Sequence, residues 1–115
     1  MINYKKNRHA HYKPTYHLVL VTKYRHKCIS DNMMERLKEI TLSLFDRWYC
    51  ELIEINGEKD HVHILFDAPP QINLANTTKS YKTVTSRYIR KEFPEELSKY
   101  YWKPYFWSRS YMILT

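Results

Sequence analysis

The sequence is poor in cysteine and contains no long apolar run. Its only two cysteines, Cys28 and Cys50, form no Cys-x-x-Cys pair, and the N-terminus lacks the apolar core of a signal peptide. We therefore expect a reducing, cytoplasmic location. No apolar run approaches the roughly 20 residues that a membrane-spanning helix needs, and no repeat or low-complexity segment is present. These absences favour an ordinary soluble domain with no membrane partner.

Negative charge is also scarce. Nineteen Lys and Arg residues stand against twelve Asp and Glu residues, which gives a net charge of +7 and a pI near 9.4. A polyanion is therefore a more natural partner than an acidic protein or a neutral small molecule. Aromatic residues make up 16% of the chain, and many of the eleven tyrosines adjoin a cation. This interleaving suits phosphate contacts combined with base stacking, although a solvated basic surface is the alternative interpretation.

The most informative motif is His61-Val62-His63, which lies in an alternating apolar and polar run. Because side chains alternate between the two faces of a strand, both imidazoles lie on one face and the apolar residues on the other. One face can be buried while the other holds a divalent metal ion, but two imidazoles are only part of a metal site. His17 and Glu54 are the alternatives for a third ligand, and a buried, hydrogen-bonded role is the other interpretation of His17.

The element pattern predicts one domain, with residues 1–13 as a basic arm and residues 14–115 as the folded core. Strands are predicted at residues 15–23, 48–55, 60–66 and 105–114, and helices from the N-cap candidates at 30–32 to about Arg47 and at 74–92. Asn56-Gly57, which contains the only glycine, is predicted to form a turn or bulge between the second and third strands. The order βαββαβ is that of the ferredoxin-like sandwich, an α+β fold with an antiparallel sheet and helices on one face.

The second predicted helix carries a cationic stripe made of Lys79, Lys82, Arg87 and Arg90, which recur at helical spacing. Such a stripe is often only a solvated face. Phosphate contact is an equal alternative here, because no acidic residue four positions away neutralises the stripe.

Four blocks occur in order along the chain. They are residues 16–25 (Tyr-His-Leu-Val-Leu-Val-Thr-Lys-Tyr-Arg), residues 60–65 (Asp-His-Val-His-Ile-Leu), the lysine-containing helix at 80–87, and residues 107–111 (Trp-Ser-Arg-Ser-Tyr). Together they resemble the small single-tyrosine HUH transposases of bacterial and archaeal insertion sequences 200 and 605. The resemblance spans about residues 14–115, and four ordered blocks are far more specific than any one of them.

The resemblance implies metal-dependent chemistry on single-stranded DNA. In that family the two histidines of the HUH motif bind the catalytic divalent ion, Mg or Mn, and they correspond to His61 and His63. The metal polarises the scissile phosphate while a tyrosine attacks it, which leaves a covalent phosphotyrosine and a free 3′-hydroxyl. Members act as homodimers on DNA hairpins near the element ends, so hairpin DNA and a second copy are the implied partners. The candidate DNA-binding residues are Lys23, Tyr24, Arg25, Lys79, Lys82, Arg87, Arg90 and Arg109.

The chain departs from the family at the nucleophile. The family carries a Tyr-x-x-x-Gln motif whose glutamine is the third metal ligand, whereas the only glutamine here is Gln71 and the residue four before it is Asp67. Tyr111 corresponds to a structural tyrosine of the family, and Tyr88 belongs to a helix expected on the opposite sheet face. The catalytic tyrosine is therefore unknown, and a shortened transposase is expected.

Three functions remain open. The first, which we favour, is a transposase or shortened copy that cleaves and rejoins hairpin DNA, with cleavage lost or completed by a partner. The second is a catalytically silent hairpin DNA-binding module that regulates a full-length transposase. The third is an RNA-binding ferredoxin-like domain, but its signature needs glycines that a chain with one glycine does not have.

Overall fold

The computed structural model describes residues 13–115, so all but the last residue of the predicted basic arm lies outside the described residues. The strands are β1 (Thr15–Thr22), β2 (Glu51–Glu58), β3 (His61–Asp67) and β4 (Trp107–Leu114). The helices are α2 (Asp31–Arg47), α3 (Leu74–Glu92) and α4 (Pro94–Ser98), and η1 (Lys23–Arg25) is a short 3-10 turn. None of the helices in the described part is long and apolar enough to cross a membrane.

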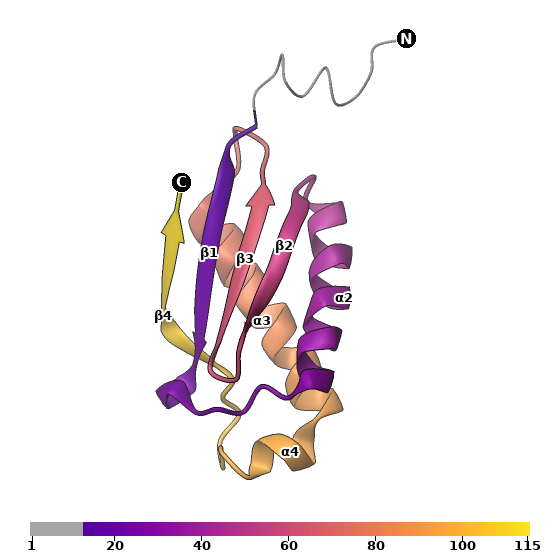
Figure 1. The fold of residues 1–115 in the computed structure, drawn as a ribbon, viewed down its shortest axis with the longest axis vertical. Coiled ribbons are helices and arrows are strands. Elements are labelled where there is room, and N and C mark those ends of the chain that lie inside the picture. Colours follow the sequence, from indigo (N-terminus) through magenta and orange to yellow (C-terminus); the bar gives the residue numbers. More distant parts are fainter. Residues whose placement is uncertain (1–12) are drawn as a thin grey trace.

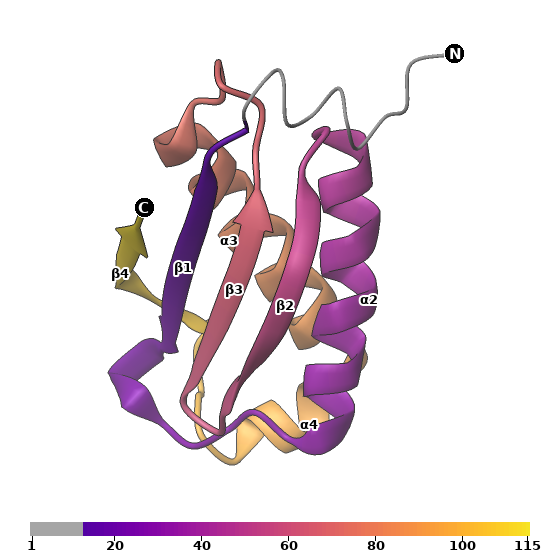
Figure 2. The ribbon, with the colours of Figure 1, turned by 45° about the horizontal axis from the view of Figure 1, so that its top comes forward.

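The four strands form one antiparallel sheet in the order β2-β3-β1-β4. In Figure 1 and Figure 2, α2 and α3 cover the same face of this sheet and leave the near face uncovered. This arrangement confirms the predicted ferredoxin-like α+β fold, with β3 as an internal strand between β2 and β1.

The core lies between the sheet and the two long helices. Leu20 on β1 and Ile64 on β3 are fully buried, as is Tyr81 on α3. Burial of one such aliphatic side chain contributes about 1.5–3 kcal/mol. The Tyr81 hydroxyl is 2.7 Å from the hydroxyl of Thr41 on α2, and this hydrogen bond satisfies two buried polar groups that would otherwise destabilise the core.

Side-chain caps place the starts of both long helices close to the predicted positions. Ser30 Oγ accepts a hydrogen bond from the backbone N–H of Met33 at 3.2 Å, and Asn73 Oδ1 accepts one from Asn76 at 3.0 Å. A cap of this kind contributes about 1 kcal/mol.

The second strand differs from the prediction at both ends. It begins at Glu51 rather than Trp48, because α2 continues to Arg47 and Tyr49 then reverses the chain with a left-handed φ of 58°. Gly57 lies inside β2 rather than in a turn, and the turn follows it at residues 59–60. The irregularity in the β2–β3 pairing falls between Leu52 and Glu54, so the predicted turn or bulge at Asn56-Gly57 is wrong.

Gly57 is needed for close backbone approach. A Cβ atom at this position would collide with the backbone oxygen of His61 and would lie 2.8 Å from Cα of Val62. The missing side chain therefore lets β2 pair with β3 directly opposite the histidine motif.

The fourth strand starts at Trp107, two residues later than predicted, and the short helix α4 precedes it. The buried Trp107 indole donates a hydrogen bond to Thr85 Oγ1 at 2.9 Å, which fixes the start of β4 to α3. Lys82 Nζ donates to the backbone oxygen of Arg109 at 3.2 Å and reinforces the same contact.

We expect Gly57→Ala to lower the free energy of unfolding by about 1–3 kcal/mol, the usual cost of inserting a methyl group where there is no room. Urea denaturation followed by circular dichroism measures this change. The matched control is the neighbouring exposed Asn56→Ala, expected to change stability by no more than about 0.5 kcal/mol. Strand propensity alone predicts the opposite sign for Gly57→Ala, so a stabilised variant would contradict the close approach.

Candidate functional site on the uncovered sheet face

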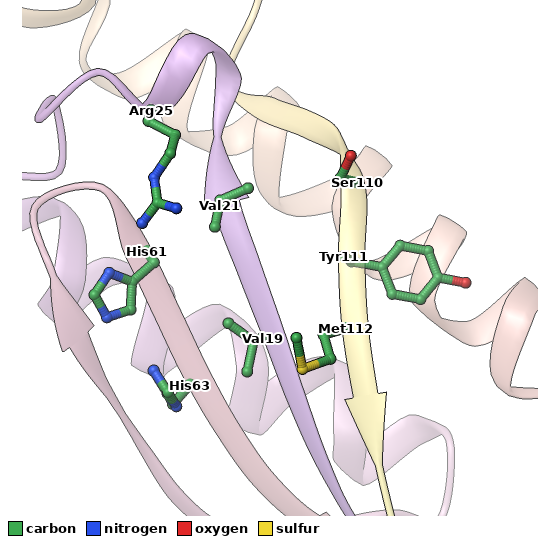
Figure 3. A pocket seen from close by; sticks show the side chains of 8 residues that line it. All are labelled: Val19, Val21, Arg25, His61, His63, Ser110, Tyr111 and Met112. Carbon is green, nitrogen blue, oxygen red and sulfur yellow. The ribbon is translucent and has the colours of Figure 1, made fainter.

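The two histidines of the motif project from β3 on the face that the helices leave uncovered, as the alternation predicts. Figure 3 shows both rings directed away from the core and toward the same side. They line a hollow of about 430 Å³ whose other walls come from β1, η1 and β4: Val19, Val21, Arg25, Ser110, Tyr111 and Met112.

His63 is held by a histidine from the neighbouring strand. The Nε2 atom of His17 is 2.9 Å from Nδ1 of His63, and the ring centroids are 5.0 Å apart. Val19, not His17, is directly opposite His63 in the β1–β3 register, so the two rings meet along a diagonal of the sheet. His17 therefore approaches the pair and is hydrogen-bonded to it.

His61 is held by a different partner. Its Nδ1 atom is 2.8 Å from Oδ1 of Asp60, and the other carboxylate oxygen of Asp60 lies 3.6 Å from the guanidinium of Arg25. The hydrogen bond from His61, together with the positive charge of Arg25, lowers the pKa of Asp60 despite some desolvation. An ionised Asp60 thus anchors both Arg25 and His61.

The electrostatics of the face favour a neutral His63. Burial lowers the pKa of His63, and the charges of His61 and His17 lower it further. A neutral imidazole is the form that binds a metal ion, because binding needs the nitrogen lone pair.

The two hydrogen bonds engage Nδ1 of both rings, and no hydrogen bond within residues 13–115 engages either Nε2 atom. Both Nε2 atoms can therefore receive another ligand. Glu54 is opposite Leu65 on β3, so it does not stand across from either histidine. Across the described residues no group of three His, Cys, Asp or Glu side chains could hold a metal ion. The described chain offers two nitrogen ligands and not a complete set.

The structure separates the predicted DNA-binding residues into two groups. Arg25 is at the hollow beside His61, on the uncovered face. Lys82, Arg87 and Arg90 line a separate hollow of about 300 Å³ between α3 and the segment that leads into β4. The remaining predicted DNA-binding residues lie on α3, η1 and β4 but line neither hollow: Lys79, Lys23, Tyr24 and Arg109.

Neither tyrosine that the sequence singles out faces the histidines. Tyr111 extends from β4 away from the two imidazoles in Figure 3, and its ring lies 5.5 Å from the ammonium of Lys82 on α3. Tyr88 is on α3, 5.5 Å from the guanidinium of Arg36, and therefore on the helical side as expected.

Sequence reasoning missed the role of Asp60. The only signal is its position immediately before His61, at the turn that opens β3, where a carboxylate can reach the following imidazole. The contact with Arg25 could not be seen in the sequence, because 35 positions separate the two residues and the pairing depends on the η1 turn.

The comparisons with known proteins agree on one family. The family model described as "Transposase IS200 like" matches residues 10–115. The ISDra2 transposase TnpA of Deinococcus radiodurans is 32% identical over 111 residues, which cover 96% of this chain and 79% of that protein. The transposase for insertion sequence element IS200 of Salmonella typhimurium is 24% identical over 107 residues, which cover 93% of this chain and 70% of that protein.

Two solved structures share the fold. One is a crystal structure from Deinococcus radiodurans R1, assigned as a transposase, which superposes on this chain with a TM-score of 0.82 at 34% sequence identity. The aligned region covers 90% of this chain and 79% of that chain. The other is a REP-associated tyrosine transposase bound to a REP hairpin, which superposes with a TM-score of 0.63 over 99% of this chain and 61% of that chain. Its sequence identity is only 10%, so it shows similarity of fold alone. With the family model matching nearly the whole length, the chain belongs to the IS200-like transposase family.

Proposed function

We propose that this protein is a metal-dependent HUH-type transposase that binds hairpin DNA at the ends of an insertion element and breaks and rejoins single strands there. The observation that carries the proposal is the pair of imidazoles on the uncovered sheet face, where both Nε2 atoms remain available beside a hollow of about 430 Å³. Family membership supports DNA as the substrate. The hairpin bound to the REP-associated relative supports that DNA shape.

His61 and His63 are the residues that would hold a divalent ion, Mg or Mn. Two imidazoles leave the rest of the coordination shell to water, phosphate oxygens or a ligand from another segment, which suits an ion that must accept a DNA phosphate. When bound, such an ion supplies Lewis-acid polarisation of a phosphate oxygen. Arg25 lines the same hollow, so its guanidinium can bind a phosphate oxygen there while Asp60 limits its movement.

Strand cleavage of this type needs a tyrosine. The phenolic oxygen attacks phosphorus while the bond to the 3′-oxygen breaks, giving phosphotyrosine and a free 3′-hydroxyl. Among residues 13–115, no tyrosine hydroxyl is hydrogen-bonded to either imidazole, and Tyr111 is turned away from them. This observation favours a second candidate function, a silent hairpin-binding module that regulates a full-length transposase.

A homodimer fits the exposed surface of β4. This strand is at the edge of the sheet and pairs only with β1 among the described strands. Met112 and Leu114 on it are 56% and 49% exposed. Exposed apolar side chains beside unpaired strand edges are typical places for association with another chain, and the resemblance implies that the other chain is a second copy.

Incubation of the purified chain with Mn²⁺ and a labelled hairpin from the ends of the nearest insertion element tests the function directly. We expect a shifted band on a native gel, because the cations of α3 and η1 attract phosphates. A covalent band on a parallel denaturing gel would establish the transposase, and peptide mapping would identify its tyrosine. A native shift without a covalent band would establish the silent module, and no shift at all would contradict both functions.

The metal assignment predicts that His61→Ala combined with His63→Ala abolishes Mn²⁺ binding, measured by titration calorimetry and by the electron paramagnetic resonance signal of free Mn²⁺. Hairpin affinity without metal should remain within about twofold, because phosphate contacts supply most of it. His26→Ala is the matched control, since that imidazole packs against Tyr101 and does not line the hollow at His61 and His63. Equal losses of metal and DNA binding would refute the assignment.

A substitution of His17 tests, in the same Mn²⁺ titration, whether His63 depends on its neighbour for its orientation. His17→Phe keeps a ring of similar size but removes the nitrogen that contacts Nδ1 of His63. We expect Mn²⁺ affinity to fall by about tenfold or more, as is usual when a partner that orients a metal ligand is lost. Unchanged affinity in this variant would show that His63 does not depend on His17 for its orientation.

The proposed dimer predicts a sedimentation-equilibrium mass of twice the chain mass of 14.2 kDa. Met112→Lys, which adds a charge at the β4 edge, should shift the protein toward monomer. Leu42→Lys is the control, because Leu42 is similarly exposed, at 57%, but belongs to α2. If both variants remained dimeric, the interface would not include this part of β4.

A further inference from the structure

A cationic and aromatic surface runs along the flank of α3, away from the histidines. The hollow of about 300 Å³ beside α3 adjoins another of about 260 Å³ near α4. Arg90, Pro104 and Tyr105 line both hollows, so the two form one continuous groove, which we call the α3 groove. Figure 1 shows the segment after α4 running back toward β4 at the lower end of the molecule.

The charge of the α3 groove has a single sign. Its cations come from α3 and from the segment after α4, and they are Lys82, Arg87, Arg90 and Lys103. No aspartate or glutamate is among the described residues that line it. Glu92, two positions after Arg90 in the sequence, does not line the groove and is paired with Arg36 at 2.7 Å. A groove of this charge complements a polyanion such as the DNA backbone.

Aromatic rings line the same groove. Trp102 is 90% exposed, the highest value among the large hydrophobic side chains of residues 13–115, and the ammonium of Lys103 lies 5.2 Å from its ring. Tyr105 is oriented edge-on to Tyr24 with centroids 5.9 Å apart. The ammonium of Lys23 lies 4.9 Å from the Tyr105 centroid and 5.2 Å from that of Tyr24. Cations and aromatic rings therefore alternate along this end of the molecule, with Trp102 and Tyr24 exposed and Tyr105 half-buried.

This alternation discriminates between nucleic acid forms. Cations alone bind the phosphates of duplex and single strands alike. An exposed indole adds stacking energy only with a base whose face is free, and bases inside a duplex are already stacked on both sides. Trp102 is exposed in a groove that also carries four cations, and this combination complements a ligand that has both phosphates and accessible π-faces.

We propose that the α3 groove binds unpaired nucleotides that continue from the hairpin, with bases stacked on Trp102 and Tyr105 and phosphates contacting Arg87, Arg90 and Lys103. The proposal deepens the proposed function and rests on it for the hairpin. The groove is lined by α3, which covers the opposite sheet face from His61 and His63, so the unpaired nucleotides are held apart from the metal ligands.

Fluorescence anisotropy with three labelled probes tests the groove: a blunt hairpin, the same hairpin with a tail of about eight unpaired thymidines, and the unpaired thymidine oligonucleotide alone. For the natural sequence we expect the tail to raise affinity about tenfold, which corresponds to about 1.4 kcal/mol. Trp102→Ala should remove this gain and leave blunt-hairpin affinity unchanged. The variant keeps the fold, because the side chain it shortens is almost fully exposed.

Two further variants separate stacking from a general surface effect. Trp102→Phe retains a stacking face and should retain most of the gain from the tail. Tyr49→Ala is the matched control, because Tyr49 is 77% exposed but is in the turn between α2 and β2, at the other end of the molecule in Figure 1. This control should bind all three probes as the natural sequence does.

The outcomes for the two proposals are distinguishable. Equal binding of blunt and tailed hairpins, or a gain that persists in Trp102→Ala, would overturn the α3 groove while hairpin binding still supports the proposed function. Binding of the thymidine oligonucleotide in a Trp102-dependent manner without binding of either hairpin would support the groove and reject the proposed function. Loss of binding to all probes would overturn both.

Discussion

Both the fold and the site depend on the alternation of apolar and polar side chains along β3, which gives the strand one buried face and one uncovered face. The strand is paired on both sides, so its backbone is fixed and only its side chains distinguish the faces. Val62 and Ile64 are fully buried against the helices, while His61 and His63 alternate with them on the uncovered face. A slip of one residue would bury both imidazoles and expose the core residues, so the register that stabilises the fold also presents the two imidazoles on the uncovered face. Gly57 permits the β2 approach that maintains this register.

The direction of each imidazole depends on contacts from outside β3. Asp60 and His17 each engage an Nδ1 atom, and Asp60 is itself held by Arg25. Arg25 reaches it because Tyr24 and Arg25 adopt left-handed φ values of 59° and 55°, a conformation that costs about 1–2 kcal/mol for each non-glycine residue. Such strain persists mainly where function requires it. Here the same turn directs Arg25 toward the histidines and Tyr24 toward Tyr105 of the α3 groove.

Strong periodic signals made most of the fold predictable. The cap at Asn73, the absence of a breaker before Pro94 and the apolar run of β3 place α3 and β3 within a residue of their observed ends. The local error at Gly57 has a tertiary cause, because the glycine serves a backbone contact with the next strand rather than a turn. The histidine pair was predictable from alternation, and His17 was already a candidate neighbour, but the contacts that orient the two rings were not predictable. The diagonal contact of His17 and the long-range pairing of Arg25 require knowledge of the sheet register and of a strained turn.

On the proposed function, β4 connects the two DNA-binding surfaces. Its residues contribute to both: Ser110 and Met112 line the hollow at the histidines, whereas Trp107 lines the α3 groove. A DNA strand held in the groove would have to cross this edge strand to reach His61 and His63, whereas Leu114, which is 49% exposed and lines neither hollow, remains available for a second copy. A duplex is too stiff for so short a path, since its persistence length is about 50 nm, whereas unpaired nucleotides can bend over a single strand. The placement of one edge strand between two surfaces therefore selects for a hairpin with an unpaired flank, rather than for continuous duplex DNA.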